Sequence, residues 1–205
     1  MKFKFYALKL CGIAIVFFLL QILIPRFTNL FLLSQEEYLQ LWRFVTSIFL
    51  HGDILHLLYN IFALALFGSI LEKLIGGKRF LIVFFGIGIL ANIIAVNFYS
   101  SSLGASGAIF GVIGTLIMVM PMLIVWAFGL PMPIFIAGIL WVAGDIIGVF
   151  NPSGIGNIAH LAGLGAGLGI GLFFRLFIQK KTPSTAKGVF VDEKNIREWE
   201  NKWMR

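Results

Sequence analysis

The chain has 205 residues, of which 60% are hydrophobic and only 12% charged, and its formal net charge is +7. Ordinary globular domains carry about 25% charged residues, so a soluble domain of this length could not bury so much apolar surface. The single cysteine, Cys11, excludes an intrachain disulfide and a thiolate metal cluster. With three histidines and few carboxylates in the apolar stretches, a metal site is poorly supplied. We therefore expect an all-α protein that crosses a membrane several times and has no metal or other cofactor.

The first apolar stretch follows a lysine-rich start and runs from Leu10 to Ile24. A basic start and an apolar middle are also features of a signal peptide. No small-residue cleavage pattern follows, however, and the stretch ends at Pro25-Arg26. The pattern favours a retained first transmembrane helix over a cleaved signal peptide. The absence of an organellar transit peptide favours a prokaryotic plasma membrane.

Six stretches approach the length that a membrane-spanning helix requires, which is about 20 apolar residues. Glycine, serine and proline clusters separate them. The predicted helices span approximately 8–25, 54–74, 79–99, 105–121, 130–150 and 156–178.

The distribution of Lys and Arg predicts the orientation of these helices, because cytoplasmic loops are enriched in both residues. Placing both termini in the cytoplasm puts fourteen of the sixteen basic residues there and leaves Arg26 and Arg43 outside. The positive net charge is then explained by the membrane topology and by attraction to anionic lipid, so it does not indicate a nucleic-acid partner. We predict a six-helix membrane domain over 1–180, followed by a basic cytoplasmic tail over 181–205.

Two further segments are amphipathic. Residues 34–45 begin with a capping serine and an acidic first turn, which predicts a short helix lying in the outer interface. In the tail, Ile196, Trp199 and Trp203 share one helical face, which is typical of a helix resting on the membrane surface. A frayed, solvated tail fits that sequence equally well.

Ser106 is the first residue of interest for chemistry. It lies in Gly104-Ala105-Ser106-Gly107, at the start of a short helix that ends before Pro121. A helix N-terminus offers free backbone N–H groups that stabilise an oxyanion formed when a serine attacks a carbonyl. Taken alone, the motif is also explained as a small-residue packing face.

His160 strengthens the catalytic interpretation of Ser106. It is followed by Gly163, Gly167 and Gly171, and glycines at four-residue spacing allow close helix approach. The predicted fourth helix has a matching small face at Gly104, Gly107, Gly111 and Gly114. Packing of these two faces would bring His160 within hydrogen-bond reach of Ser106, where a neutral imidazole can activate the hydroxyl.

The predicted second helix adds His56 and Asn60, which share one helical face. Their side-chain N–H groups are suitable donors to an oxyanion. A metal site or a proton relay involving His51 as well is an alternative, but Asp53 is the one carboxylate beside these residues in sequence. We interpret His51 as a structural loop residue.

Together these features resemble the rhomboid intramembrane serine proteases over roughly residues 40–178. The motifs that carry the resemblance occur in the family's order. They are Trp42-Arg43, His56-x-x-x-Asn60, Gly104-Ala105-Ser106-Gly107 and Ala159-His160-x-x-Gly163-x-x-x-Gly167.

The resemblance implies a Ser–His dyad with no acidic third member, in which Ser106 is the nucleophile and His160 the general base and then the general acid. His56, Asn60 and the Ser106 backbone N–H would form the oxyanion hole. Phe110 replaces the family's usual tyrosine, so it should still stack on the histidine without a hydroxyl. The other residues expected to support the site are Gly104, Gly107, Asn157, Gly163 and Gly167.

The resemblance also implies a lateral gate at the fifth helix and a cap at about 150–155. The expected substrates are single-pass membrane proteins, cut in or near their transmembrane segments. Two alternatives use the same helices: a catalytically inactive relative that binds membrane-protein clients, and a small transporter with a histidine proton path. Asp145 has no assigned role beyond capping or pairing near the outer end of the fifth helix. The sequence determines neither the substrate nor the oligomeric state.

Overall fold

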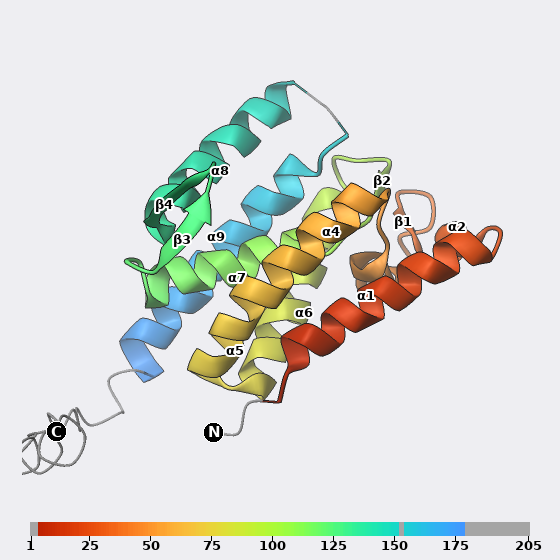
Figure 1. Cartoon of the computed structure of the whole chain (residues 1–205). Helices are drawn as coiled ribbons and strands as arrows, with labels where there is room; N and C mark the ends of the chain where they lie inside the picture. The colour runs from red at the N-terminus through yellow and green to blue at the C-terminus, as the bar shows by residue number, and fades with distance from the viewer. Residues whose placement is uncertain (1–3, 152–153, 179–205) are drawn as a thin grey trace, which may run out of the picture.

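The computed structural model describes residues 4–151 and 154–178, and these ranges are mostly helical (Figure 1). The predicted tail helix after Asp192 lies outside the described residues. Each of the six predicted apolar stretches contains a helix. Within the described ranges, four helical segments are long and apolar enough to cross a membrane: Tyr6–Leu23, Ile54–Ile75, Gly77–Ala95 and Asn157–Phe177. Two further apolar helices are shorter, α7 (Ser106–Val119) and α8 (Ile134–Phe150).

The second membrane segment is one continuous helix with a wider turn in its middle. It comprises α4 (Ile54–Ala63), the π-turn η2 (Leu64–Gly68) and α5 (Ser69–Ile75). Gly76, with a φ of 85°, ends it and starts α6 (Gly77–Ala95). Glycine adopts this left-handed backbone without steric cost, so the two helices can reverse direction in one residue.

Helix α7 lies in the middle of the bundle and packs most extensively against α9 (Asn157–Phe173). The glycine faces predicted from sequence form this contact. A Cβ at Gly163 would meet the carbonyl oxygen of Gly107, and one at Gly167 would meet that of Gly111. The two backbones touch, which fixes the position of α9 relative to α7. Figure 1 shows α1 (Tyr6–Leu23) on one side of the bundle and α8 on the other.

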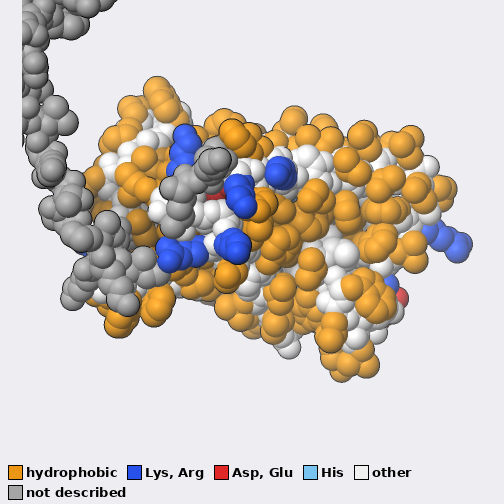
Figure 2. Space-filling model, turned by 90° about the horizontal axis from the view of Figure 1, so that it is seen from below, with side chains coloured by type: hydrophobic (Ala, Val, Ile, Leu, Met, Phe, Trp, Pro, Cys, Tyr) orange, Lys and Arg blue, Asp and Glu red, His pale blue; other side chains and the backbone are white. Residues whose placement is uncertain are grey.

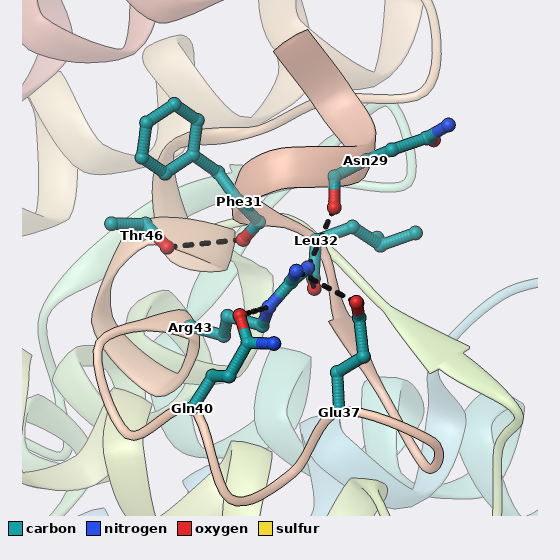
Figure 3. A network of polar contacts seen from close by, with 7 residues as sticks. All are labelled: Asn29, Phe31, Leu32, Glu37, Gln40, Arg43 and Thr46. Carbon is teal, nitrogen blue, oxygen red and sulfur yellow. Dashed lines mark hydrogen bonds and ion pairs between the residues drawn. The ribbon is translucent and has the colours of Figure 1, made fainter. Parts of the chain in front are cut away.

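The predicted helix over 34–45 is wrong. That segment consists mainly of turns, and a helix begins only at α3 (Arg43–Thr46). The reason is that Arg43 is buried and turned toward the end of the preceding short helix, where it donates to the carbonyl oxygens of Asn29 and Leu32 at 2.7 and 2.6 Å (Figure 3). The remaining short elements of the region are α2 (Phe27–Phe31), β1 (Leu33–Ser34), which pairs with β2 (Ser101–Ser102), and η1 (Ser47–Phe49).

A β-hairpin precedes α8 where the sequence predicted the start of the fifth helix. Strands β3 (Ile124–Ala127) and β4 (Leu130–Pro133) pair antiparallel through Phe128 and Gly129, both with positive φ. Positive φ at both central residues is the geometry of a tight hairpin turn. The fifth helix therefore begins at residue 134, four residues later than predicted.

Basic side chains gather on the face of the bundle seen from below (Figure 2). The end of α5 and the start of α6 contribute Lys73, Lys78 and Arg79 at this end. The π-turn that follows α9, η3 (Phe174–Ile178), carries Arg175. The start of α1 lies at the same end, where the buried carboxylate of Glu72 accepts from the backbone N–H groups of Lys4 and Ala7. Both ends of the described chain are thus on the basic side (Figure 1).

Candidate active site

Ser106 is the first residue of α7, as the sequence predicted. The loop before it is held by a hydrogen bond from the Gly104 N–H to the Ser47 carbonyl at 2.9 Å. Gly104 has a φ of 113°, a conformation that a residue with a side chain rarely adopts. The first N–H groups of a helix have no partner within the helix. The half-buried Ser106 hydroxyl is therefore close to backbone donors and to the positive end of the helix dipole.

His160 lies one turn into α9, across the close contact with α7. Its ring is stacked on that of Phe110, with 4.3 Å between centroids and 3° between planes. The predicted stacking on a phenylalanine is thus present. Phe110 follows Ser106 by four residues, so both occupy one face of α7. No hydrogen bond joins the Ser106 hydroxyl to His160 among the residues that the structure describes, and such bonds often tighten only when substrate binds.

The histidine has an acidic neighbour, contrary to the expectation of a dyad without one. Asp145, near the end of α8, has its Oδ1 atom 3.0 Å from Nδ1 of His160. Both side chains are largely buried. Asp53 is the one carboxylate beside the histidines in sequence, and the fold adds Asp145 from another helix. The pair could not be recognised from the sequence because its residues are 15 positions apart. An aspartate inside an apolar helix nevertheless indicates a functional residue.

His56 lies on the other side of Gly104. A Cβ placed on Gly104 would be 2.8 Å from Cε1 and 2.9 Å from Nε2 of His56, and 3.9 Å from the Ser106 hydroxyl. The absent side chain of Gly104 thus makes room for His56 beside the serine. The Gly52 N–H points at Nδ1 of His56 at 3.4 Å, which places the proton of the neutral ring on Nε2. Asp53 caps this helix by accepting from the His56 backbone N–H at 2.8 Å.

Asn60 is buried one turn below His56. Its side-chain amide donates to the His56 carbonyl oxygen at 2.8 Å, within the same helix. One amide N–H is therefore used locally and the second remains for another acceptor. The Asn60 Oδ1 atom is buried without a hydrogen-bond partner among the described residues.

The remaining predicted residues have structural contacts. Asn157 is buried at the start of α9, donates to the Ile155 carbonyl at 3.3 Å and packs against Gly148 of α8. His51 is fully buried in the loop before α4, with its ring at a steep angle to that of His56 and 5.0 Å between centroids. Within the described ranges, no group of three or more His, Cys, Asp or Glu side chains is placed to hold a metal ion. The predicted cap over 150–155 lies partly outside these ranges.

The fold is that of a helical integral membrane protein with a serine and a histidine on two tightly packed helices. A model of the rhomboid domain matches residues 38–177, and the chain belongs to the rhomboid family. It is 32% identical to the rhomboid protease GlpG of Serratia proteamaculans over 177 residues, which cover 78% of this chain and 59% of that protein.

Two other relatives are more similar over shorter stretches. The rhomboid protease GluP of Bacillus subtilis is 42% identical over 90 residues, which cover 43% of this chain and 17% of that protein. Rhomboid-like protease 3 of Toxoplasma gondii is 42% identical over 77 residues, which cover 37% of this chain and 29% of that protein. The chain covers less than two thirds of each of these three relatives.

Proposed function

We propose that this protein is a serine endopeptidase that cleaves transmembrane segments of other proteins within the membrane. Ser106 is the nucleophile and His160 the general base. The observation that carries the proposal is the stacking of His160 on Phe110, one helical turn from Ser106. This observation supports the proposal because the imidazole and the hydroxyl belong to two helices whose backbones touch. Relatives named as proteases support the same activity.

The proposed reaction follows from the positions of these groups. His160 takes the Ser106 proton as Oγ bonds to the scissile carbonyl carbon, and the carbonyl oxygen becomes an oxyanion. The Ser106 backbone N–H, the Nε2–H of His56 and the free amide N–H of Asn60 are its donors. His160 then protonates the leaving amine as the C–N bond breaks, and water hydrolyses the acyl-enzyme by the reverse sequence of proton transfers.

The proposed topology has six spans and both termini in the cytoplasm. It is supported by the basic end of the bundle, where α5 and α6 meet and their ends carry Lys73, Lys78 and Arg79, while α2, which follows Arg26, lies toward the other end. With 14 residues, α7 is about 21 Å long, less than the roughly 30 Å of a bilayer core. A helix this short supports a position of Ser106 below the outer surface, at a depth suited to transmembrane substrates.

The test is labelling of the purified protein by a fluorophosphonate probe, which reacts with activated serines and requires no known substrate. We expect labelling of the wild type and of Ser101→Ala, a control on an exposed serine in β2, but not of Ser106→Ala or His160→Ala. Thermal unfolding of each variant verifies the fold. Absence of labelling in folded wild type would reject the proposal in favour of a client-binding relative without catalysis. Cleavage of a reconstituted single-pass substrate then tests the substrate class.

A further inference from the structure

Asp145 is the buried acidic group nearest to the proposed catalytic histidine, and it comes from a different helix. Its Oδ1 atom lies 3.0 Å from Nδ1 of His160. Its Oδ2 atom is buried and has no hydrogen-bond partner among the described residues. Within the described ranges, the polar contact of this carboxylate is therefore with His160. An ionisable side chain in an apolar helix is costly and usually functional.

The contact with Nδ1 determines what the other ring nitrogen can do. A carboxylate accepts but does not donate, so Nδ1 must carry the proton. In the neutral ring, Nε2 then has the free lone pair and is the atom able to take the serine proton. When that proton arrives, the nearby negative charge stabilises the imidazolium.

The ring is therefore held in two independent ways. Stacking on Phe110 of α7 fixes the plane of the His160 ring. The hydrogen bond to Asp145 of α8 fixes the direction in which Nδ1 points within that plane. Among the described residues, the charged or titratable side chains near His160 are Asp145 of α8 and His56 of α4. Of these two, Asp145 is the one whose charge is opposite to that of an imidazolium.

We propose that Asp145 is a positioning residue that orients His160, selects its Nδ1-protonated tautomer and stabilises its cationic form, so that the site acts as a serine–histidine–aspartate triad. This inference rests on the proposed function, since it assumes that His160 is the base for Ser106. A latch that merely ties α8 to α9 is the competing explanation, and it predicts an effect on stability alone.

The experiment compares Asp145→Asn, Asp145→Glu and the neighbouring control Gly144→Ala. The added methyl group at Gly144 would meet nothing within 4 Å. This variant therefore controls for effects of any substitution in α8 that do not involve the contact with His160. The first measurement is the rate of fluorophosphonate labelling against pH. The second is the kcat and KM for a reconstituted transmembrane substrate. Thermal unfolding accompanies both.

For Asp145→Asn we expect a loss of labelling rate and kcat of between about 10- and 10⁴-fold with KM little changed. The pH profile of the labelling rate should also change, because the group in contact with Nδ1 of His160 no longer carries a charge. Asp145→Glu should retain part of the rate, and Gly144→Ala should match the wild type. An unchanged rate and pH profile in folded Asp145→Asn, with the wild type fully labelled, would overturn the inference but leave the proposed function standing.

A readout independent of activity is the ¹⁵N spectrum of histidine-labelled protein. The chain has three histidines, so His160→Gln identifies the His160 signals by difference. We expect a neutral His160 with its proton on Nδ1 in the wild type, and a different tautomer mixture in Asp145→Asn. The same Nε2-protonated ring in both proteins would contradict the inference.

Discussion

The imidazole of His160 and the phenyl ring of Phe110 are parallel, with 4.3 Å between centroids. Behind Phe110 lies Trp141 of α8, in an edge contact with 6.3 Å between ring centroids. Trp141 precedes Asp145 by one helical turn. Helix α8 thus supports the histidine twice, through the Trp141–Phe110 contact and through the carboxylate at Nδ1. A shift of α8 would disturb both supports together.

Phe110→Leu should lower kcat by about 2- to 10-fold, because a stacked aromatic pair contributes about 0.5–1.5 kcal/mol beyond its buried area. Phe110→Tyr keeps the ring and should retain most of the rate. The measurement is cleavage of a reconstituted transmembrane substrate. Phe62→Leu is the matched control, since Phe62 is 67% exposed on the outside of the bundle. Equal rates for Phe110→Leu and Phe62→Leu would remove the stacking from the mechanism.

Gly167→Ala should destabilise the protein by about 1–3 kcal/mol or more, because the added methyl group would meet the backbone carbonyl of Gly111 and force α7 and α9 apart. Gly165→Ala, two residues away on the same helix, would meet nothing within 4 Å and serves as the control. Thermal unfolding in detergent should show a lower Tm for Gly167→Ala only. Equal Tm values would show that the close contact does not matter for stability.

The packing of α7 on α9 could be predicted from the sequence because its cause is local. Glycines four residues apart line one side of a helix wherever that helix lies, and two such helices in one bundle favour each other. The Asp145–His160 pair could not be predicted in this way. It joins two helices across a 15-residue separation, and whether their side chains meet depends on how α8 lies against α9.

The hairpin before α8 was missed for a different reason. Apolar residues continue from Met122 into α8, and an uninterrupted apolar stretch does not distinguish a strand from a buried helix. Prolines are typical of a helix boundary, but Pro131 and Pro133 both lie in β4. The segment 34–45 was predicted to be helical because a serine followed within three residues by two glutamates is typical of a helix start, but this local preference is weak. The four contacts of the buried Arg43 guanidinium stabilise the observed turns more than the capping pattern stabilises a helix.

Arg43→Lys should lower the Tm, because lysine keeps the charge but cannot reproduce the geometry of the guanidinium. Arg43 donates to two backbone carbonyls and to the Gln40 side chain at 2.9 Å, and it pairs with Glu37 at 2.7 Å (Figure 3). Each carbonyl left without a partner costs about 1–3 kcal/mol where it is buried. Thermal unfolding checks this, with the exposed Arg26→Lys as control. A loss of stability equal to that of the control would mean that the loop does not depend on Arg43.

The stability of the fold should decrease as the pH falls from about 6.5 to 4, in part because of His51. This side chain lies in the loop before the second membrane segment. Burial, and secondarily the charge of His56, lowers its pKa from 6.5 to about 4. In this pH range the unfolded chain binds a proton at His51 that the folded chain does not, so acid favours unfolding. The stabilisation is complete above about pH 6.5, and about 3 kcal/mol of it is lost below pH 4.

The measurement for this pH effect is thermal unfolding of the wild type and His51→Asn between pH 4 and 8. Asparagine does not titrate, and its amide can replace the contact of Nδ1 with the Phe49 carbonyl at 3.2 Å. Because His56 and His160 are present in both proteins, the difference between the two curves isolates His51. We expect the wild type to lose more stability than the variant as the pH falls. Parallel curves over the whole range would show that His51 takes up its proton equally in the folded and unfolded states.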